Sequence, residues 1–255
     1  MPAPIPDPAA KSVDAAPASG APAQALEALK TYDRGSGRAA LLPLDQAVAA
    51  ASMNASPARQ QLEQQLAAIL QAGGSAVARE YLCSKLALIG SARSAAALGA
   101  LLDDALLATA ARNALEALPT TAAAQALRER LPHLQSLEKV GAVNSLGRLG
   151  DAASTGPLTE LLKNAEGEVA VAAAAALGGI GSVQAGEALR DFYAKAPESL
   201  RLGTADALLN CAERLLGANQ RGEAQALYQA LARATPPAPV HDAAQRGLRA
   251  CAGKG

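Results

Sequence analysis

The sequence is poor in aromatic residues, which usually contribute much of the buried area in a globular core. Its 255 residues include one Phe, four Tyr and no Trp, although half of all residues are apolar. The core must therefore be filled mainly by Ala and Leu, which also rank among the strongest helix formers. Strand-favouring residues are thinly spread. The composition thus predicts an all-α protein.

An excess of charge of either sign is also missing. Lys plus Arg and Asp plus Glu both total 23, so the formal net charge is zero. Proteins that hold nucleic acid through phosphate contacts generally carry a basic excess, so we expect no nucleic acid partner. No apolar run approaches the roughly 18 to 20 residues that span a bilayer, which predicts no membrane insertion.

Residues that commonly carry catalysis or bind metals are scarce. Only His133 and His241 could serve as histidine bases, and no CxxC motif contains the three cysteines Cys83, Cys211 and Cys251. Nucleophilic triads, zinc sites and redox pairs need more such groups at defined spacings. The sequence therefore predicts a protein that is not an enzyme, with no catalytic, cofactor-binding or metal site.

The first residues form an Ala/Pro-rich tract. Six prolines lie within residues 1–22, and proline removes a backbone donor and disfavours helix in the preceding residue. We therefore predict a disordered lead-in over 1–22 and a folded domain over 23–255. The tract lacks the basic and apolar regions of a secretory signal, so the sequence fits either a cytoplasmic protein or a mature exported chain without its signal.

An internal repeat dominates the rest of the chain. Leucines that we call anchors recur at steps of 29, 31, 31, 31 and 40 residues, at Leu86, Leu115, Leu146, Leu177, Leu208 and Leu248. Small or apolar residues stand four positions before each anchor, namely Leu82, Ala111, Ala142, Ala173, Thr204 and Ala244. Apolar residues stand three positions after, namely Ile89, Leu118, Leu149, Ile180, Cys211 and Cys251. These positions share one helical face.

Each anchor helix should end soon after this stripe. Gly90, Pro119, Gly150 and Gly181 follow it directly, where a helix stop belongs. In the last two units Ala212 and Ala252 replace them, so the helix around Leu208 is expected to continue to Leu216.

A second helix precedes each anchor helix. Its apolar pairs keep the same spacing, with Leu98, Leu127, Leu158 and Leu189 followed four residues later by Leu102, Leu131, Leu162 and Tyr193. Less regular hairpins are expected at 23–32 with 38–51, 57–71 with 75–89, and 221–234 with 240–252. Neither helix of a pair can bury its stripe without the adjoining unit. The sequence predicts an α-solenoid of about seven antiparallel helix pairs with a concave inner face.

These columns carry a family resemblance. The segments VAVAAAAALGGIGS (169–182) and KVGAVNSLGRLGDAASTGPLTELLKNAEGEV (139–169) resemble HEAT-like repeats of the phycobilisome-lyase type. That resemblance implies the fold and leaves the function open among chromophore-handling lyases, adaptors and scaffolds. The Ala-rich segment 207–248 is similar to HEAT arrays of exported planctomycete and verrucomicrobial proteins. This second resemblance implies a bacterial cell-envelope or periplasmic location and a larger parent protein.

Three groups of residues are candidates for more than packing. Cys83, Cys211 and Cys251 occupy core columns and are interpreted as apolar filler, because equivalent positions in stacked helices lie too far apart for a disulfide. The aromatics could mark interaction hot spots, although Tyr193 occupies a core column. A polar column seven residues before the anchor contains Arg79, Lys139, Arg201 and His241, interrupted by Ala108 and Ala170.

Two interpretations of this polar column stay open. It could be a row of cations that binds a partner, or a structural ladder of ion pairs. The resemblance to HEAT-like repeats favours the ladder, with partners among Asp103, Asp104, Glu166, Glu168 and Glu198.

The leading functional hypothesis is a noncatalytic protein–protein interaction scaffold or adaptor. It would bind a partner protein, or an adjoining domain of a larger parent, along the concave face of the solenoid. One alternative is a lyase-like protein that binds a tetrapyrrole in the groove. A second is a HEAT-type DNA glycosylase, against which the zero net charge and absent Trp argue. The sequence assigns no protein-binding residues and no oligomeric state.

Overall fold

The computed structural model describes residues 21–118, 120–164, 167–234 and 236–253. Within these ranges the regular structure is entirely helical, and no strand is present. Most of the predicted lead-in, residues 1–20, lies outside the described residues. Ala21 and Pro22 open the first helix, where proline is tolerated because the first N–H groups of a helix have no partner within it.

The helices alternate between two layers. The odd-numbered, outer layer consists of α1 (Ala21–Leu29), α3 (Pro57–Ala72), α5 (Ala92–Gly99), α7 (Thr121–Arg130), α9 (Thr155–Asn164), α11 (Val183–Tyr193) and α13 (Arg221–Arg233). The even-numbered, inner layer consists of α2 (Leu42–Ser52), α4 (Ala76–Ile89), α6 (Ala108–Ala117), α8 (Ser136–Leu149), α10 (Gly167–Ile180), α12 (Glu198–Gly217) and α14 (Ala238–Ala252). Two short 3-10 helices, η1 (Arg38–Leu41) and η2 (Ala152–Ser154), precede α2 and α9.

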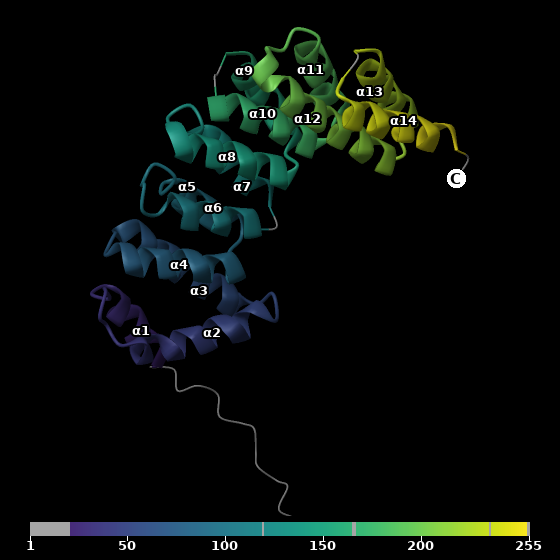
Figure 1. Cartoon of the computed structure of the whole chain (residues 1–255). Helices are drawn as coiled ribbons and strands as arrows, with labels where there is room; N and C mark the ends of the chain where they lie inside the picture. Colours follow the sequence, from purple (N-terminus) through teal and green to yellow (C-terminus); the bar gives the residue numbers. More distant parts are fainter. Residues whose placement is uncertain (1–20, 119, 165–166, 235, 254–255) are drawn as a thin grey trace, which may run out of the picture.

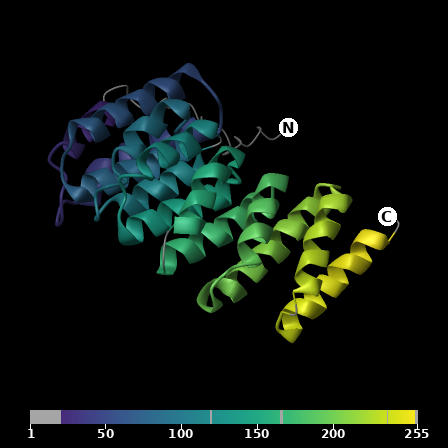
Figure 2. The same ribbon diagram turned by 90° about the horizontal axis from the view of Figure 1, so that it is seen from above.

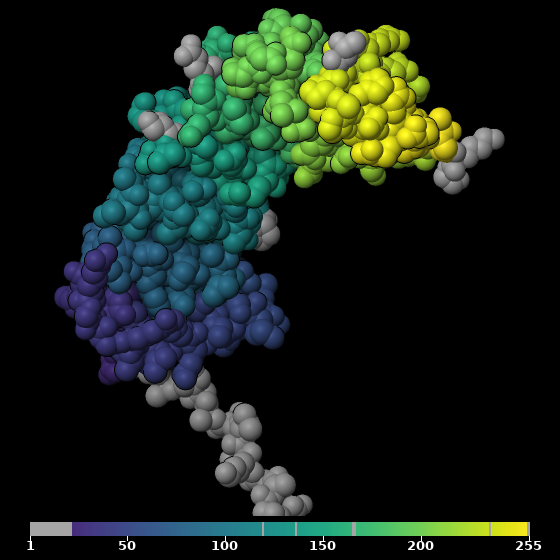
Figure 3. Space-filling model, in the orientation of Figure 1, coloured from purple at the N-terminus to yellow at the C-terminus, as the bar shows by residue number. Residues whose placement is uncertain are grey.

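The pairs stack in chain order into a curved body (Figures 1 and 3). Each inner helix from α2 to α12 contacts the next inner helix along the chain, ending with the contact between α12 and α14. In Figure 1, α10, α12 and α14 lie on the inner side of the bend and α9, α11 and α13 on its outer side. The first and last units lie at opposite ends of the body in both ribbon views (Figure 2). The α-solenoid predicted from the repeat is confirmed.

The predicted columns form the core. All six residues four positions before the anchors are fully buried, as are the anchors from Leu86 to Leu208. The leucine pairs of the outer helices, including Tyr193 in its leucine column, are buried as well. Leu248 differs, because it is only half-buried. It lies in α14, beyond which the described residues contain no further unit to cover it.

Local sequence explains where the helices begin and end. The side chains of Ser56, Ser75, Ser91, Thr120 and Ser182 accept hydrogen bonds from backbone N–H groups in the first turns of their helices. Gly150 ends α8 in the left-handed conformation at φ 63°. Helix α12 has no such stop and continues to Gly217, as the sequence predicts. The predicted stop at Pro119 lies outside the described residues.

Two glycines bring the central inner helices unusually close together. A Cβ on Gly147 of α8 would lie 2.6 Å from Ala176 Cα of α10, and a Cβ on Gly178 would lie 2.6 Å from the Ala207 carbonyl oxygen of α12. Both glycines stand one residue after an anchor, and both alanines stand one residue before an anchor. The close packing of α8, α10 and α12 therefore repeats with the sequence.

Candidate functional site

The solvent side of the inner layer carries nearly all of the large apolar residues that the structure leaves exposed. Those in the inner helices or the turns beside them are Leu42, Met53, Leu88, Leu106, Leu137, Val171 and Leu202, and the described outer helices contain none. We call this solvent side the inner face. Burying apolar side chains is favourable, so a set of them confined to one face marks an interaction surface.

Two sequence columns build the inner face. Six residues before the anchors stand Glu80, Thr109, Val140, Val171, Leu202 and Asp242. Two residues before the anchors stand Ser84, Asn113, Asn144, Ala175, Asp206 and Arg246. All twelve side chains are exposed or half-buried. In three successive units the first of these columns is apolar, a signal that lies one position after the polar column and outside the columns that form the core.

Three hollows lie in a row along the inner face, each between neighbouring inner helices. One of about 410 Å³ lies between α4 and α6, and one of about 390 Å³ between α6 and α8. The largest, about 880 Å³, extends from α8 across α10 to α12. Thr109 lines the first two, while Val140 and Asn144 line the second and third. The shared residues show that the three hollows adjoin one another, and we call the row of hollows the groove.

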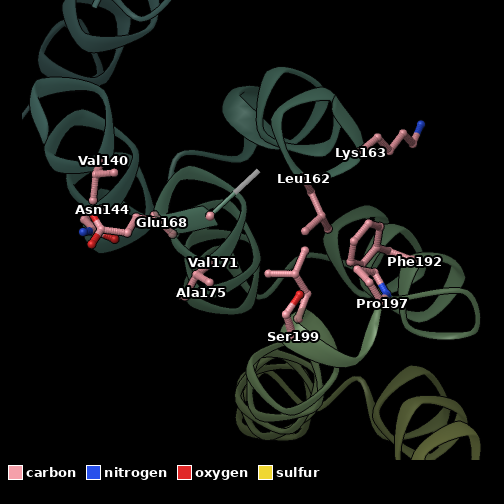
Figure 4. A pocket seen from close by; sticks show the side chains of 13 residues that line it. Val140, Asn144, Leu162, Lys163, Glu168, Val171, Ala175, Phe192, Pro197 and Ser199 are labelled. Carbon is pink, nitrogen blue, oxygen red and sulfur yellow. The ribbon is translucent and has the colours of Figure 1, made fainter. Parts of the chain in front are cut away.

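The largest hollow is mainly apolar and opens along the first halves of α8, α10 and α12 (Figure 4). Val171, with 46% of its surface exposed, projects from α10 between the two sides of the hollow. Leu162 and Phe192, at the ends of α9 and α11, reach it from the outer layer. The glycine contacts described above hold the last turns of α8 and α10 against the next inner helix, so the opening lies toward the first halves of these two helices and ends near Asn144 and Ala175.

The second hollow is polar. Its lining includes Arg112, Arg148, Glu138 and the Asn144 amide. Arg148 Nε donates to Glu116 Oε2 at 2.8 Å, and Ser145 also donates to this carboxylate. Burial alone would raise the pKa of Glu116, but these hydrogen bonds, together with the positive charges of Arg148 and Arg112, outweigh it and hold the pKa below its ordinary value. Glu116 thus fixes Arg148 and joins α6 to α8.

The polar column predicted from the sequence is only partly an ion-pair ladder. Arg79 Nη1 lies 3.4 Å from Asp104 Oδ2, in the turn before the next inner helix. Arg201 instead donates to the Ala196 carbonyl oxygen at 3.4 Å. Within the described part of the chain, Arg79 is the one member of the column that forms an ion pair.

One of the other proposed partners of that column pairs elsewhere. Asp103 pairs with Arg130 of α7. Glu166 lies outside the described residues. Ala108 and Ala170, which interrupt the column, are buried, so the column forms no continuous cationic strip.

The cysteines are free. Cys83 and Cys211 are buried, and burial raises the pKa of each thiol to about 11. Cys251 is half-buried. The prediction that the first two fill apolar core positions is confirmed, and thiols of this pKa are unreactive at neutral pH.

The aromatic residues mostly pack within the fold. Tyr193 and Tyr228 are buried, and Tyr81 donates to Asp45 Oδ1 at 2.9 Å, which joins α4 to α2. Lys85 lies 2.7 Å from the same carboxylate and 4.6 Å from the Tyr81 ring. Phe192 is the aromatic residue that lines the largest hollow. Tyr81, Tyr193 and Tyr228 therefore already pack or form hydrogen bonds within the chain. Tyr32 is half-buried.

The histidines stay apart from the groove. His133 is exposed in the turn after α7, and His241 in α14 lies 3.5 Å from the Gln245 amide. Across the described ranges, no three His, Cys, Asp or Glu side chains gather as metal ligands would. None of the helices in these ranges combines the length and apolarity that crossing a bilayer requires.

Comparisons with known proteins bear on the repeat. Residues 136–209, from α8 to the middle of α12, match the family model described as HEAT repeats. No curated protein matches the chain. Among solved structures, the chain is similar to an engineered protein of known crystal structure, with 20% identity, a TM-score of 0.41, and coverage of 81% of this chain and 96% of that chain.

Proposed function

Because this chain is a HEAT-like repeat protein, we propose that it is a noncatalytic scaffold that binds a partner protein along its inner face. The observation that carries the proposal is the groove from α4 to α12, together with the exposed apolar side chains on that layer. HEAT repeats generally serve as interaction modules. The partner is another protein or an adjoining domain of a larger parent.

The shape of the surface supports a protein partner. The groove crosses five inner helices, and α4, α6, α8 and α10 each contribute the same two columns to it, so a long segment can contact several units at once. Val171 and Leu202 are 46% and 55% exposed and stand at equivalent positions in consecutive units. Covering such side chains contributes roughly 25 cal/mol for each Å² of apolar surface removed from water. The tetrapyrrole and DNA alternatives, and the envelope location, stay predictions from the sequence.

Site-specific photocross-linking tests the proposal. A benzophenone amino acid is placed at Leu202 on the inner face or at Ala226, an exposed position of outer helix α13, and the full chain is expressed in its source cells. We expect a protein adduct from position 202 that is absent from position 226. The adduct should weaken when Val171→Asp is added. Equal adducts from both positions, or an adduct that Val171→Asp leaves unchanged, would contradict binding at the inner face.

A further inference from the structure

We infer that the groove takes an extended partner segment in which an acidic side chain pairs with Arg112 and an apolar side chain, about three residues away, enters the hollow around Val171. The inference rests on the proposed function and specifies the chemistry of the partner.

Arg112 is the first observation. Its Nε is buried without a hydrogen bond, and its Nη2 donates to Thr109 Oγ1 at 3.4 Å. Among the described residues it forms no ion pair, whereas Arg79 and Arg148 on neighbouring inner helices each bind a carboxylate. Arg112 Nη1 makes no hydrogen bond among the described residues, so the guanidinium keeps a donor for an acceptor from outside the chain.

Packing against α8 keeps this guanidinium in the groove. It lies over Gly141, where a Cβ would come within 2.6 Å of Arg112 Nε. The glycine therefore leaves the space that the side chain occupies, and Arg112 lines the hollow between α6 and α8. Pre-positioning lowers the entropy lost when the side chain forms further bonds.

Arg112 is the guanidinium in the lining of the second hollow that no carboxylate binds in an ion pair. Two guanidinium groups and one carboxylate, that of Glu138, line it. Arg148 is already held by Glu116, and no ion pair joins Glu138 to Arg112. A carboxylate of the partner would meet a planar guanidinium with free donors, which is the geometry of a bidentate pair. A lysine or arginine of the partner would meet Arg112 unfavourably.

The apolar requirement comes from the adjoining hollow. Val140 and Asn144 line both hollows, so a segment that leaves Arg112 toward α10 remains in contact with the chain. There Val171, Leu162 and Leu200 present apolar surface. Neighbouring helices pack about 8 to 10 Å apart, and an extended chain advances about 3.3 Å per residue. The step from one inner helix to the next therefore corresponds to about three residues of the segment.

The asparagines favour an extended segment over a helix. Asn113 and Asn144 stand at equivalent positions on α6 and α8, and neither amide side chain makes a hydrogen bond within the described residues. Each offers a donor and an acceptor to the groove. A helical partner satisfies its own backbone groups, whereas an extended segment exposes them for such bonds.

The test uses a random library of phage-displayed dodecapeptides, selected on the full chain. We expect the enriched peptides to share Asp or Glu about three residues from Leu, Ile, Val or Met. Arg112→Gln should weaken their binding about tenfold in fluorescence polarisation, as loss of a charge-assisted hydrogen bond implies. Arg93→Gln, at an exposed arginine of outer helix α5, is the matched control and should leave binding unchanged. Thermal unfolding of each variant verifies its fold.

The outcomes separate the two claims. If the peptides lose affinity with Val171→Asp but lack the acidic residue, this inference is overturned and inner-face binding stands. The same holds if they lose affinity with Val171→Asp but bind Arg112→Gln as tightly as the wild type. Peptides that ignore both substitutions bind elsewhere and count against both claims. A selection that enriches no peptide overturns the inference of an extended segment, while the cross-linking experiment still decides the scaffold role.

Discussion

Replacing Gly178 by alanine should destabilise the chain, although alanine is the better helix former. The added Cβ would lie 2.6 Å from the Ala207 carbonyl oxygen and 3.0 Å from Ala207 Cα, so it meets backbone of α12 rather than a flexible side chain. Overpacking of this kind costs about 1 to 3 kcal/mol. Glycine to alanine in a helix returns up to about 1 kcal/mol. We expect a net loss of about 1 kcal/mol for Gly178→Ala.

A matched control is available in α12. Gly203 is also helical, and a Cβ there would have no atom within 4 Å, so Gly203→Ala should gain about 0.5 to 1 kcal/mol. Thermal unfolding followed by circular dichroism measures both variants. A chain of this size shifts by about 2 to 4 °C per kcal/mol, so the two melting temperatures should move in opposite directions. If Gly178→Ala raised the melting temperature as Gly203→Ala does, the close approach of α10 and α12 would be refuted.

Three further predictions follow from buried groups. Glu63 is 2% exposed and accepts hydrogen bonds from Ser91 and Ser94, so Glu63→Ala should cost about 2 kcal/mol in urea unfolding; a neutral result would mean that its carboxylate is dispensable. Burial raises the pKa of all three thiols, to about 11 for Cys83 and Cys211, but Cys251 is only half-buried. A thiol reagent at mildly alkaline pH should therefore react first with Cys251, and a fast phase that survives Cys251→Ser would contradict this. The pKa of Glu116 is lowered, so its contribution to stability is present above the unfolded value near 4.5 and is lost as pH falls through the folded pKa. The urea midpoints of wild type and Glu116→Gln should therefore converge in acid, and a constant gap would show that its ionisation is not involved.

The sequence was sufficient to predict the core because the core is periodic. Every unit must bury the same stripe against its neighbour, so Leu86, Leu115, Leu146 and Leu177 could be aligned without coordinates. Helix ends marked by a Ser or Thr cap or by a Gly stop could also be predicted, because these signals act within a few residues of the helix end. The first helix, expected to reach Tyr32, ends at Leu29, because the turn to η1 begins there.

The groove could be predicted only in part. The column that contains Val140, Val171 and Leu202 has the same period as the core, and a search for apolar residues in solvent-facing columns would have found it. The state of Arg112 could not be found in this way, because it depends on the space above Gly141 and on which arginine reaches Glu116. Which arginine pairs with Glu116 depends on side-chain geometry between neighbouring units, and the spacing of residues along the sequence does not determine it.

Nearest-neighbour stacking also makes the length of the protein adjustable. Because each unit packs mainly on the units before and after it, duplication or deletion of one repeat of 31 residues would lengthen or shorten the inner face by about 8 to 10 Å. The remaining contacts would keep their geometry. The length of the inner face is in this way set by the number of repeats, and gene duplication can change it without altering the packing between any two units.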